Sequence, residues 1–374
     1  MRAVVYHGAN DLRLETLPVP LIGRHELLVR VSVCGVCPTD IKKIHYGTVS
    51  PPRVFGHETA GTIVRAGSGV QGFKVGDRVA LHHHVPCLKC HACRHRAFAQ
   101  CLHYKRTGIT AGFEPAGGGY AEFVRVLPLV LPGVVKIPPR NSFLEGAMLE
   151  PVNTVLKAVE RLSPLRGDTV LVAGQGPIGL MFTRLLTLRK VKVIATDLLE
   201  SRLQTAAAFG ARSVVRVGHP QKPTAATKGR VPVSKTRVRG EASLATVVDQ
   251  LTSGRGLDGA VIAVPSKEAM REAQLLVRGG GKVLLFSHTK RGDLAELDLA
   301  TICVDEKDLI GSYSADFLLQ REVARLVFSR QIDVRRLITH QFPLEQTAAA
   351  IGLASKPTPD SLKVVVNQQL DCTV

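Results

Sequence analysis

The stretch TVLVAGQGPIGLMFTRLLTLRKVKVIATD, residues 169–197, decides the fold of this chain. It begins with an apolar run typical of a buried strand, turns at glycines, and continues with a helix-like segment before a second apolar run. Strand, helix and strand in that order predict two parallel strands joined by a crossover helix. The same alternation continues to about residue 288, which predicts an α/β fold with a doubly wound parallel sheet.

The glycines of this stretch, in the order GQGPIG, lie directly between the first strand and the helix. Glycines at such a turn let the backbone approach a pyrophosphate, whose charge is stabilised by the helix amino terminus. The second strand ends in Asp197, where a carboxylate can hold both ribose hydroxyls of NAD and repel the extra phosphate of NADP. Arg202, five residues on, could partly restore NADP binding. The residues predicted to bind the cofactor are Gly174, Gly176, Pro177, Ile178, Gly179, Asp197 and Arg202.

The amino-terminal part of the chain has a different pattern of apolar runs and turn residues. Up to about residue 140, short apolar runs alternate with Gly and Pro turns, which predicts a small, irregular β-barrel. A chain of 374 residues, 45% of them hydrophobic, is long enough for two cores. We therefore expect a β-barrel domain over residues 1–152, a dinucleotide-binding domain over 153–312, and a carboxyl-terminal segment, 313–374, that returns to the first domain.

The net charge of +18 is unevenly spread, since residues 212–240 hold eight basic residues and no acidic one. Prolines and the lack of apolar periodicity in this stretch predict a surface insertion outside the active site. One alternative function is nucleic-acid binding through loop 219–240 together with the cysteine-rich segment 82–106, for which a zinc site is predicted below. No aromatic residues are interleaved with the basic ones, so nucleic acid is not an expected partner.

With no apolar run of 18 residues and no signal-like start, we expect no membrane contact and a cytoplasmic location.

Four of the eight cysteines lie close together, at positions 87, 90, 93 and 101. Disulfides would be unusual in a chain of this size without a signal peptide. Four thiolates so close in sequence can surround a tetrahedral zinc and leave no position open for a substrate. We therefore predict a structural zinc held by Cys87, Cys90, Cys93 and Cys101, in a lobe over residues 82–106.

Further motifs follow one another in a recognisable order: CGVCPTD at 34–40, GHETAGTIV at 56–64, LEPVNT at 149–154 and GQGPIG at 174–179. With these motifs and the four-cysteine lobe, the chain resembles the zinc-dependent medium-chain alcohol dehydrogenases, and most of all their sorbitol and threonine dehydrogenase branch. The resemblance spans nearly the whole chain except the basic stretch. It implies a GroES-like β-barrel catalytic domain, a Rossmann domain and a cleft between them.

The resemblance also implies a catalytic zinc, and so two zinc ions per chain. Cys37 and His57 match two of its ligands, and the third would be Glu58 or Glu150, because classical members carry a cysteine where Glu150 stands. The residue types suit zinc, and an open fourth position would let the metal bind an alcohol oxygen. The choice between the two glutamates stays open at this point.

Two more residues of the first motif carry roles in the family. The Thr39 hydroxyl would accept the proton of the substrate alcohol, and Asp40 would orient His57. Pro38 stands where some relatives carry an arginine for the pyrophosphate, and Lys42 stands where a histidine often ends the proton relay.

The function implied by the resemblance is NAD-linked interconversion of a secondary alcohol or polyol and its ketone, by a homo-oligomer that is a dimer or a tetramer. A strand in DLIGSYS, residues 308–314, could pair sheets across a dimer. The alternative enzyme is a medium-chain reductase acting on another carbonyl substrate. Neither the physiological substrate nor the direction of flux follows from the sequence.

Overall fold

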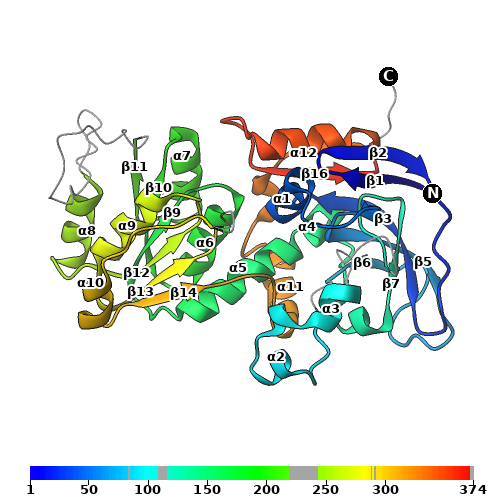
Figure 1. The fold of residues 1–374 in the computed structure, drawn as a ribbon, viewed down its shortest axis with the longest axis horizontal. Helices are drawn as coiled ribbons and strands as arrows, with labels where there is room; N and C mark the ends of the chain where they lie inside the picture. The colour runs from blue at the N-terminus through cyan, green and yellow to red at the C-terminus, as the bar shows by residue number, and fades with distance from the viewer. Residues whose placement is uncertain (83–84, 108–115, 219–242, 288, 290–291, 371–374) are drawn as a thin grey trace. The chain divides into compact units, whose positions relative to one another are not determined.

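The computed structural model describes residues 1–82, 85–107, 116–218, 243–287, 289 and 292–370. The chain forms two compact units (Figure 1): Met1–Thr154 together with Ser314–Val374 make up the first, and Val155–Tyr313 the second. The basic stretch 219–240, for which we expect a surface insertion, lies outside the described residues.

The first unit is built on two β-sheets. Their strands are β1 (Arg2–Gly8), β2 (Asp11–Thr16), β3 (Leu27–Gly35), β4 (Arg53–Val54), β5 (Glu58–Ala66), β6 (Arg78–Ala80), β7 (Phe123–Val126), β8 (Val135–Lys136), β15 (Ile338–Phe342) and β16 (Lys363–Asn367). One sheet has the order β2-β1-β4, and the larger one has the order β15-β16-β3-β5-β6-β8, with β7 also paired to β3. Strand β3 is buried at every position except Arg30, and most of its side chains are apolar, so it forms the centre of this core.

The helices of the first unit are short. They are α1 (Pro38–Tyr46), α2 (His91–Arg94), α3 (Leu102–Thr107), α4 (Phe143–Ala147), α11 (Gln320–Phe328) and α12 (Thr347–Ser355), and α5 (Leu149–Leu162) begins in this unit. The apolar periodicity suggests one helix from about residue 143 to 163, but the structure has two, α4 and α5, separated at Met148. Pro151 explains the break, because it has no N–H to donate to the preceding turn and is tolerated only in the first turn of a helix.

The second unit is the doubly wound sheet that the sequence predicts. Its strands are β9 (Thr169–Ala173), β10 (Lys192–Asp197), β11 (Ser213–Arg216), β12 (Leu257–Ile262), β13 (Val277–Leu285) and β14 (Asp308–Gly311). All are parallel, in the order β11-β10-β9-β12-β13-β14, so the winding reverses between β9 and β12. In such sheets a dinucleotide binds at the carboxyl ends of the strands where the winding reverses.

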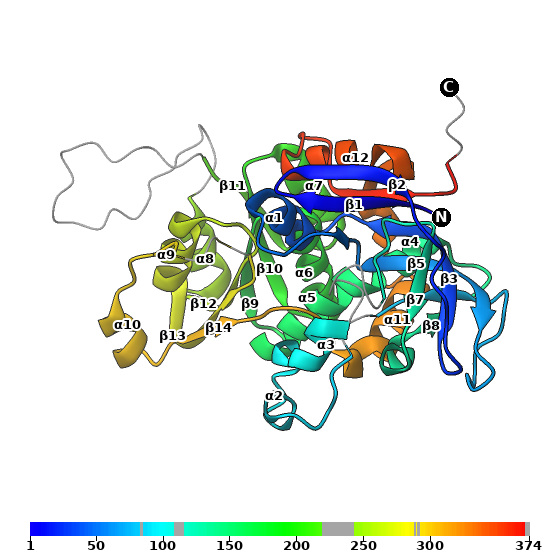
Figure 2. The ribbon, with the colours of Figure 1, turned by 45° about the vertical axis from the view of Figure 1, so that its right-hand side comes forward.

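Helices cover both faces of this sheet (Figure 2). They are α6 (Pro177–Leu188), α7 (Glu200–Ala208), α8 (Leu244–Thr252), α9 (Lys267–Leu276) and α10 (Leu299–Val304). Leu244 of α8 and Met270 of α9 belong to the same apolar cluster as Leu171 and Ile194 of the strands. None of the helices in the described ranges combines the length and apolar character that crossing a bilayer requires.

Candidate metal centres and cofactor site

The pairing of β3 with β5 brings three candidate zinc ligands together in the first unit. The strands are antiparallel, with Gly35 opposite Glu58, so the end of one lies beside the start of the other. Cys37 follows β3 and His57 immediately precedes β5. One ligand atom each from Cys37, His57 and Glu58 lie within 4.8 Å of one another. A thiol, an imidazole and a carboxylate make up a donor set that suits a three-ligand zinc site with an open position.

The local sequence around Cys37 builds the amino-terminal end of α1. Cys37 has an extended conformation and caps the helix, and its Sγ accepts the backbone N–H of Thr39 at 3.4 Å. Pro38 occupies the first helical position, where no N–H is needed, and Gly47 ends the helix in the left-handed region. The cap therefore places the thiol, the half-buried Thr39 and the buried Asp40 around one helical turn.

Asp40 lies against His57, with 3.0 Å between Oδ2 and Nδ1. Burial disfavours the imidazolium, but the negative charges of Asp40 and Cys37 outweigh it and hold the pKa of His57 well above its ordinary value. Burial also opposes ionisation of Asp40, yet the charge of His57 leaves the pKa of Asp40 lowered. Because Nδ1 faces the carboxylate, Nε2 is the nitrogen that can bind a metal.

The other predicted carboxylate, Glu150, lies in the first turn of α5 and is buried. It belongs to neither group of clustered ligand atoms within the described ranges. Burial, partly offset by the positive charge of His57, raises the pKa of Glu150 to about 7. The structure thus brings Glu58, and not Glu150, into the group with Cys37.

Lys363 is a residue of this site that the sequence analysis misses. Its Nζ lies 2.6 Å from Oε1 and 2.5 Å from Oε2 of Glu58, and it donates to the carbonyl of Val36 at 2.9 Å. Burial disfavours the ammonium, but the charge of Glu58 dominates and the pKa of Lys363 is raised. In the sequence, the only distinguishing feature of Lys363 is its position directly before the apolar run VVV. A charged residue there usually marks the end of a strand at the surface, so the sequence gives no sign of a buried lysine.

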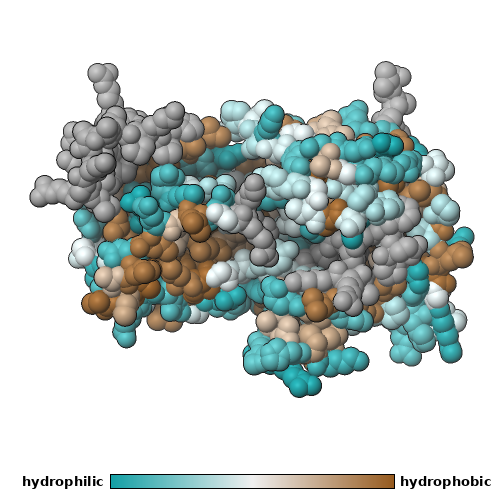
Figure 3. All heavy atoms as spheres, in the orientation of Figure 1, coloured by the Kyte–Doolittle hydropathy of each residue, from teal (hydrophilic) through white to brown (hydrophobic). Residues whose placement is uncertain are grey.

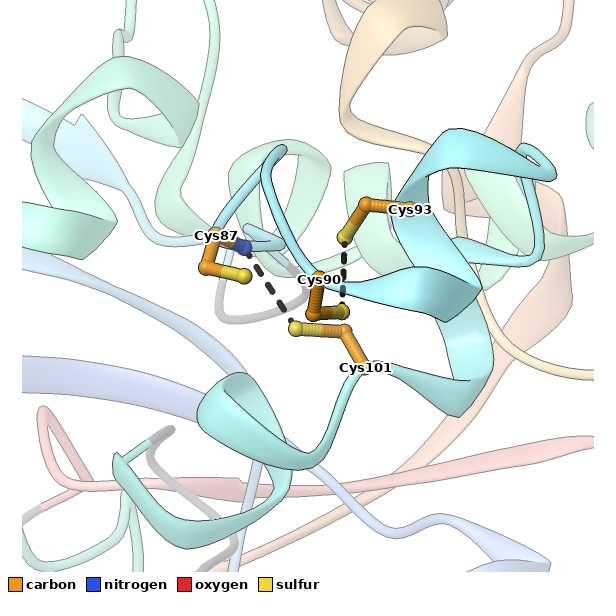
Figure 4. Close-up of side chains that lie close together, drawn as sticks. All are labelled: Cys87, Cys90, Cys93 and Cys101. Carbon is orange, nitrogen blue, oxygen red and sulfur yellow. Dashed lines mark hydrogen bonds between the residues drawn. The ribbon is translucent and has the colours of Figure 1, made fainter.

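The four remaining candidate ligands form the lobe predicted for a structural zinc (Figure 4). One sulfur atom each from Cys87, Cys90, Cys93 and Cys101 lie within 4.8 Å of one another. Backbone N–H groups of Lys89 and Cys90 lower the pKa of Cys87 to about 6, which favours its thiolate form. All seven cysteines in the described ranges are free thiols, so the four of this cluster are available as metal ligands.

The lobe packs against the rest of the first unit through aromatic residues. The ring of Phe98 meets that of Phe317 edge to face, with 5.7 Å between the centroids. Tyr104 completes the small apolar cluster around the cysteines. A cluster this small buries little apolar surface, so a metal bound by the four thiols would add substantially to the stability of the lobe.

The GQGPIG turn of the second unit has the geometry of a phosphate-binding loop. Gly174 has a φ of +91°, and a Cβ on Gly179 would lie 1.7 Å from the carbonyl oxygen of Gly174, so neither position accepts a side chain. A Cβ on Gly176 would meet nothing within 4 Å, which is the open approach that a pyrophosphate needs. Pro177 and Ile178 begin α6, whose amino terminus faces this turn.

Asp197 lies at the end of β10, beside this turn. Its Oδ2 accepts the backbone N–H of Gln175 at 2.6 Å and its Oδ1 accepts that of Leu199 at 2.9 Å, which holds the carboxylate in place. Arg202 approaches the same carboxylate, with 4.0 Å between Nη1 and Oδ2. The sequence-predicted cofactor residues therefore lie together in the second unit.

Comparisons with known proteins agree with this chemistry. Residues 23–139 match the alcohol dehydrogenase GroES-like domain, and residues 177–329 match the zinc-binding dehydrogenase domain. The chain is 30% identical to sorbitol dehydrogenase of Bombyx mori, over 98% of each chain, and 29% identical to that of Bacillus subtilis, over 98% and 97%.

A solved structure from Sinorhizobium meliloti, described as a zinc-binding dehydrogenase bound to NADP, superimposes with a TM-score of 0.81 at 25% identity, over 98% of each chain. The full-length similarity supports the same family as the two groups of candidate zinc ligands and the dinucleotide-type sheet. The chain belongs to the zinc-dependent medium-chain alcohol dehydrogenases, and it is an oxidoreductase.

Proposed function

We propose that this enzyme interconverts a secondary alcohol group of a polyol and the corresponding ketone, with NAD as the electron carrier. The observation that carries the proposal is the group formed by Cys37, His57 and Glu58, with Thr39 and Asp40 on the adjoining helical turn. The similarity to sorbitol dehydrogenases supports a polyol as the substrate class. A reductase acting on another carbonyl compound is the competing function, and it lacks a specific observation in its favour.

When bound, zinc would supply a Lewis acid that lowers the pKa of the alcohol, and the nicotinamide would supply a hydride acceptor. Cys37, His57 and Glu58 would hold the metal, because their ligand atoms cluster whereas Glu150 lies outside the group. Asp40 fixes the ring of His57. The Thr39 hydroxyl, half-buried on the first turn of α1, would take the proton from the alcohol.

The substrate class can be tested by following NAD reduction with a panel of sugar alcohols, diols, threonine and simple secondary alcohols. We expect the highest kcat/KM with a polyol. A preference for threonine or for a primary alcohol would contradict the proposed substrate class. Turnover confined to the reduction of carbonyl compounds unrelated to ketoses would favour the reductase instead.

Cofactor choice gives a separate prediction. We propose that NAD is preferred over NADP, because the buried Asp197 carboxylate would repel a 2′-phosphate. Asp197→Ser is expected to shift the ratio of the two kcat/KM values toward NADP by about 10-fold or more, which corresponds to about 1.4 kcal/mol. Asp249→Ser, an exposed carboxylate on α8, is the matched control and should leave the ratio unchanged. Equal kcat/KM values for the two cofactors in the wild type would refute the preference.

We also propose that the enzyme is a homo-oligomer, a dimer or a tetramer, in the cytoplasm, where its free thiols stay reduced. Strand β14 ends the order of the second sheet, and an unpaired strand edge is a template for another strand. Exposed apolar side chains gather near this edge (Figure 3), including Leu299, Val304 and Leu309. Light scattering should give two or four times the chain mass of 40.3 kDa, and a monomer would refute the proposal.

A further inference from the structure

Two histidines on the surface of the four-cysteine lobe belong to neither group of clustered ligand atoms. His91 is the first residue of α2, and His95 directly follows its last residue. We propose that His91 and His95 form a third metal site, which binds one zinc ion or a similar transition-metal cation. The inference goes beyond the proposed function and does not depend on it, because neither the catalytic centre nor the cofactor takes part.

The backbone of α2 brings the two rings together. The backbone N–H of His95 donates to the carbonyl of His91 at 3.3 Å, which is the hydrogen bond of one α-helical turn. Side chains four residues apart on such a turn are neighbours on one face. The two ring centroids lie 4.6 Å apart, and the ring planes are tilted by 54° instead of being stacked. The turn therefore presents two imidazoles side by side.

This pair of rings suits a metal that binds two nitrogens. Histidines four residues apart on a helix have the spacing that lets both rings bind one zinc. Each nitrogen lies about 2.0–2.1 Å from a bound zinc, so two such nitrogens are at most about 4.2 Å apart. Rings with centroids 4.6 Å apart can meet this condition, and both side chains are exposed, so water can fill the remaining positions. Among the described residues, neither ring takes part in a hydrogen bond or ion pair that a metal would have to break.

The charges near α2 decide which cations this pair can bind. Residues 85–107 contain no acidic residue, and Lys89, Arg94 and Arg96 are exposed beside the histidines in the sequence. Magnesium and calcium need carboxylate and other oxygen ligands, which this segment does not supply from acidic side chains. Imidazole nitrogens instead bind zinc, nickel and copper. The site therefore selects transition metals, and zinc is the expected occupant in a protein of a zinc-binding family.

The proposed site is separate from the four-thiolate site of the same lobe. Cys93 lies between the two histidines in the sequence, but its side chain is buried whereas theirs are exposed. Figures 1 and 2 show α2 at the tip of the lobe, away from the sheets of the first unit. A metal bound by both rings would tie together the two ends of α2, and so it would stabilise the folded lobe.

The test is nickel binding to the zinc-loaded enzyme, because metal analysis distinguishes added nickel from the zinc already bound. We expect the wild type to bind one nickel ion per chain and to keep its zinc. His91→Gln and His95→Gln should each weaken nickel binding by about 10-fold or more, since a single ring cannot chelate. The double variant should bind nickel about as weakly as either single one, because both lose the same chelate. Magnesium should not displace the nickel.

His25→Gln is the matched control, because His25 is an exposed histidine whose Nδ1 lies 3.1 Å from the carbonyl oxygen of Gly69. This variant should bind nickel like the wild type. Nickel should also raise the melting temperature of the wild type but not that of His91→Gln, since a ligand stabilises the fold that binds it.

Three results would overturn the inference: no nickel binding to the wild type, nickel that replaces zinc instead of adding to it, or unchanged nickel affinity in His91→Gln and His95→Gln. Binding without a rise in melting temperature would also overturn it, because the two rings are brought together only in the folded lobe. If His91→Gln does not fold, His95→Gln decides the matter, since either substitution leaves one ring.

Discussion

Replacing Cys93 with serine is expected to remove one of two zinc ions per chain and to lower the melting temperature by roughly 10 °C or more. Cys93 is buried among the three other thiols of the lobe, and a hydroxyl is a poor substitute for a thiolate at a structural zinc. The lobe has only a small apolar cluster of its own, so the loss of metal ligation is not compensated by packing. Metal analysis and thermal unfolding of the purified variant measure both effects.

Cys303→Ser is the matched control for this experiment. Cys303 is an exposed free thiol on α10 and belongs to neither ligand group, so this variant should keep both zinc ions and its melting temperature. If Cys93→Ser retained two zinc ions, the four-cysteine cluster would not be a metal site. If it lost the ion without losing stability, the lobe would not depend on its metal.

Replacing Cys37 with serine is expected to leave the fold intact and to lower kcat/KM by about 1000-fold, the scale seen when a group that stabilises transition-state charge is removed. The thiol is one of three candidate ligands of the catalytic metal and also caps α1, where a serine hydroxyl can take over the cap. Circular dichroism and the retained four-thiolate zinc would show that the fold survives.

Cys34→Ala separates ligand loss from packing loss in the same motif. Cys34 is buried three residues earlier and contacts the hydroxyl of Thr59 at 3.5 Å, but it belongs to neither ligand group. Burial raises the pKa of this thiol to about 12, so it stays protonated and makes a poor ligand. We expect Cys34→Ala to keep two zinc ions and most of its activity. Full activity in Cys37→Ser would refute the assignment of the catalytic site.

Much of this enzyme is determined by short-range patterns in its sequence. The alternation of apolar runs and helix periodicity predicts the parallel sheet, because a strand and its crossover helix are neighbours in the chain. The glycine turn with Asp197 and the four-cysteine lobe are equally readable from the sequence, since each is a motif with a characteristic spacing of residue types. The basic stretch 219–240 is also a local pattern, and its placement as a surface insertion stays a prediction.

The register of strand pairing, which no sequence motif reports, decides the rest. The sequence leaves Glu58 and Glu150 as equal candidates for the third ligand. The β3–β5 register places Glu58 opposite Gly35, so that its carboxylate clusters with Cys37 and His57, and the choice of Glu58 as ligand stays a proposal. Lys363 reaches the same carboxylate through β16, 305 residues further along the chain, and no local pattern can report a contact at that separation. Burial and charge pairing at this site depend on which backbones become neighbours, so only the tertiary structure decides them.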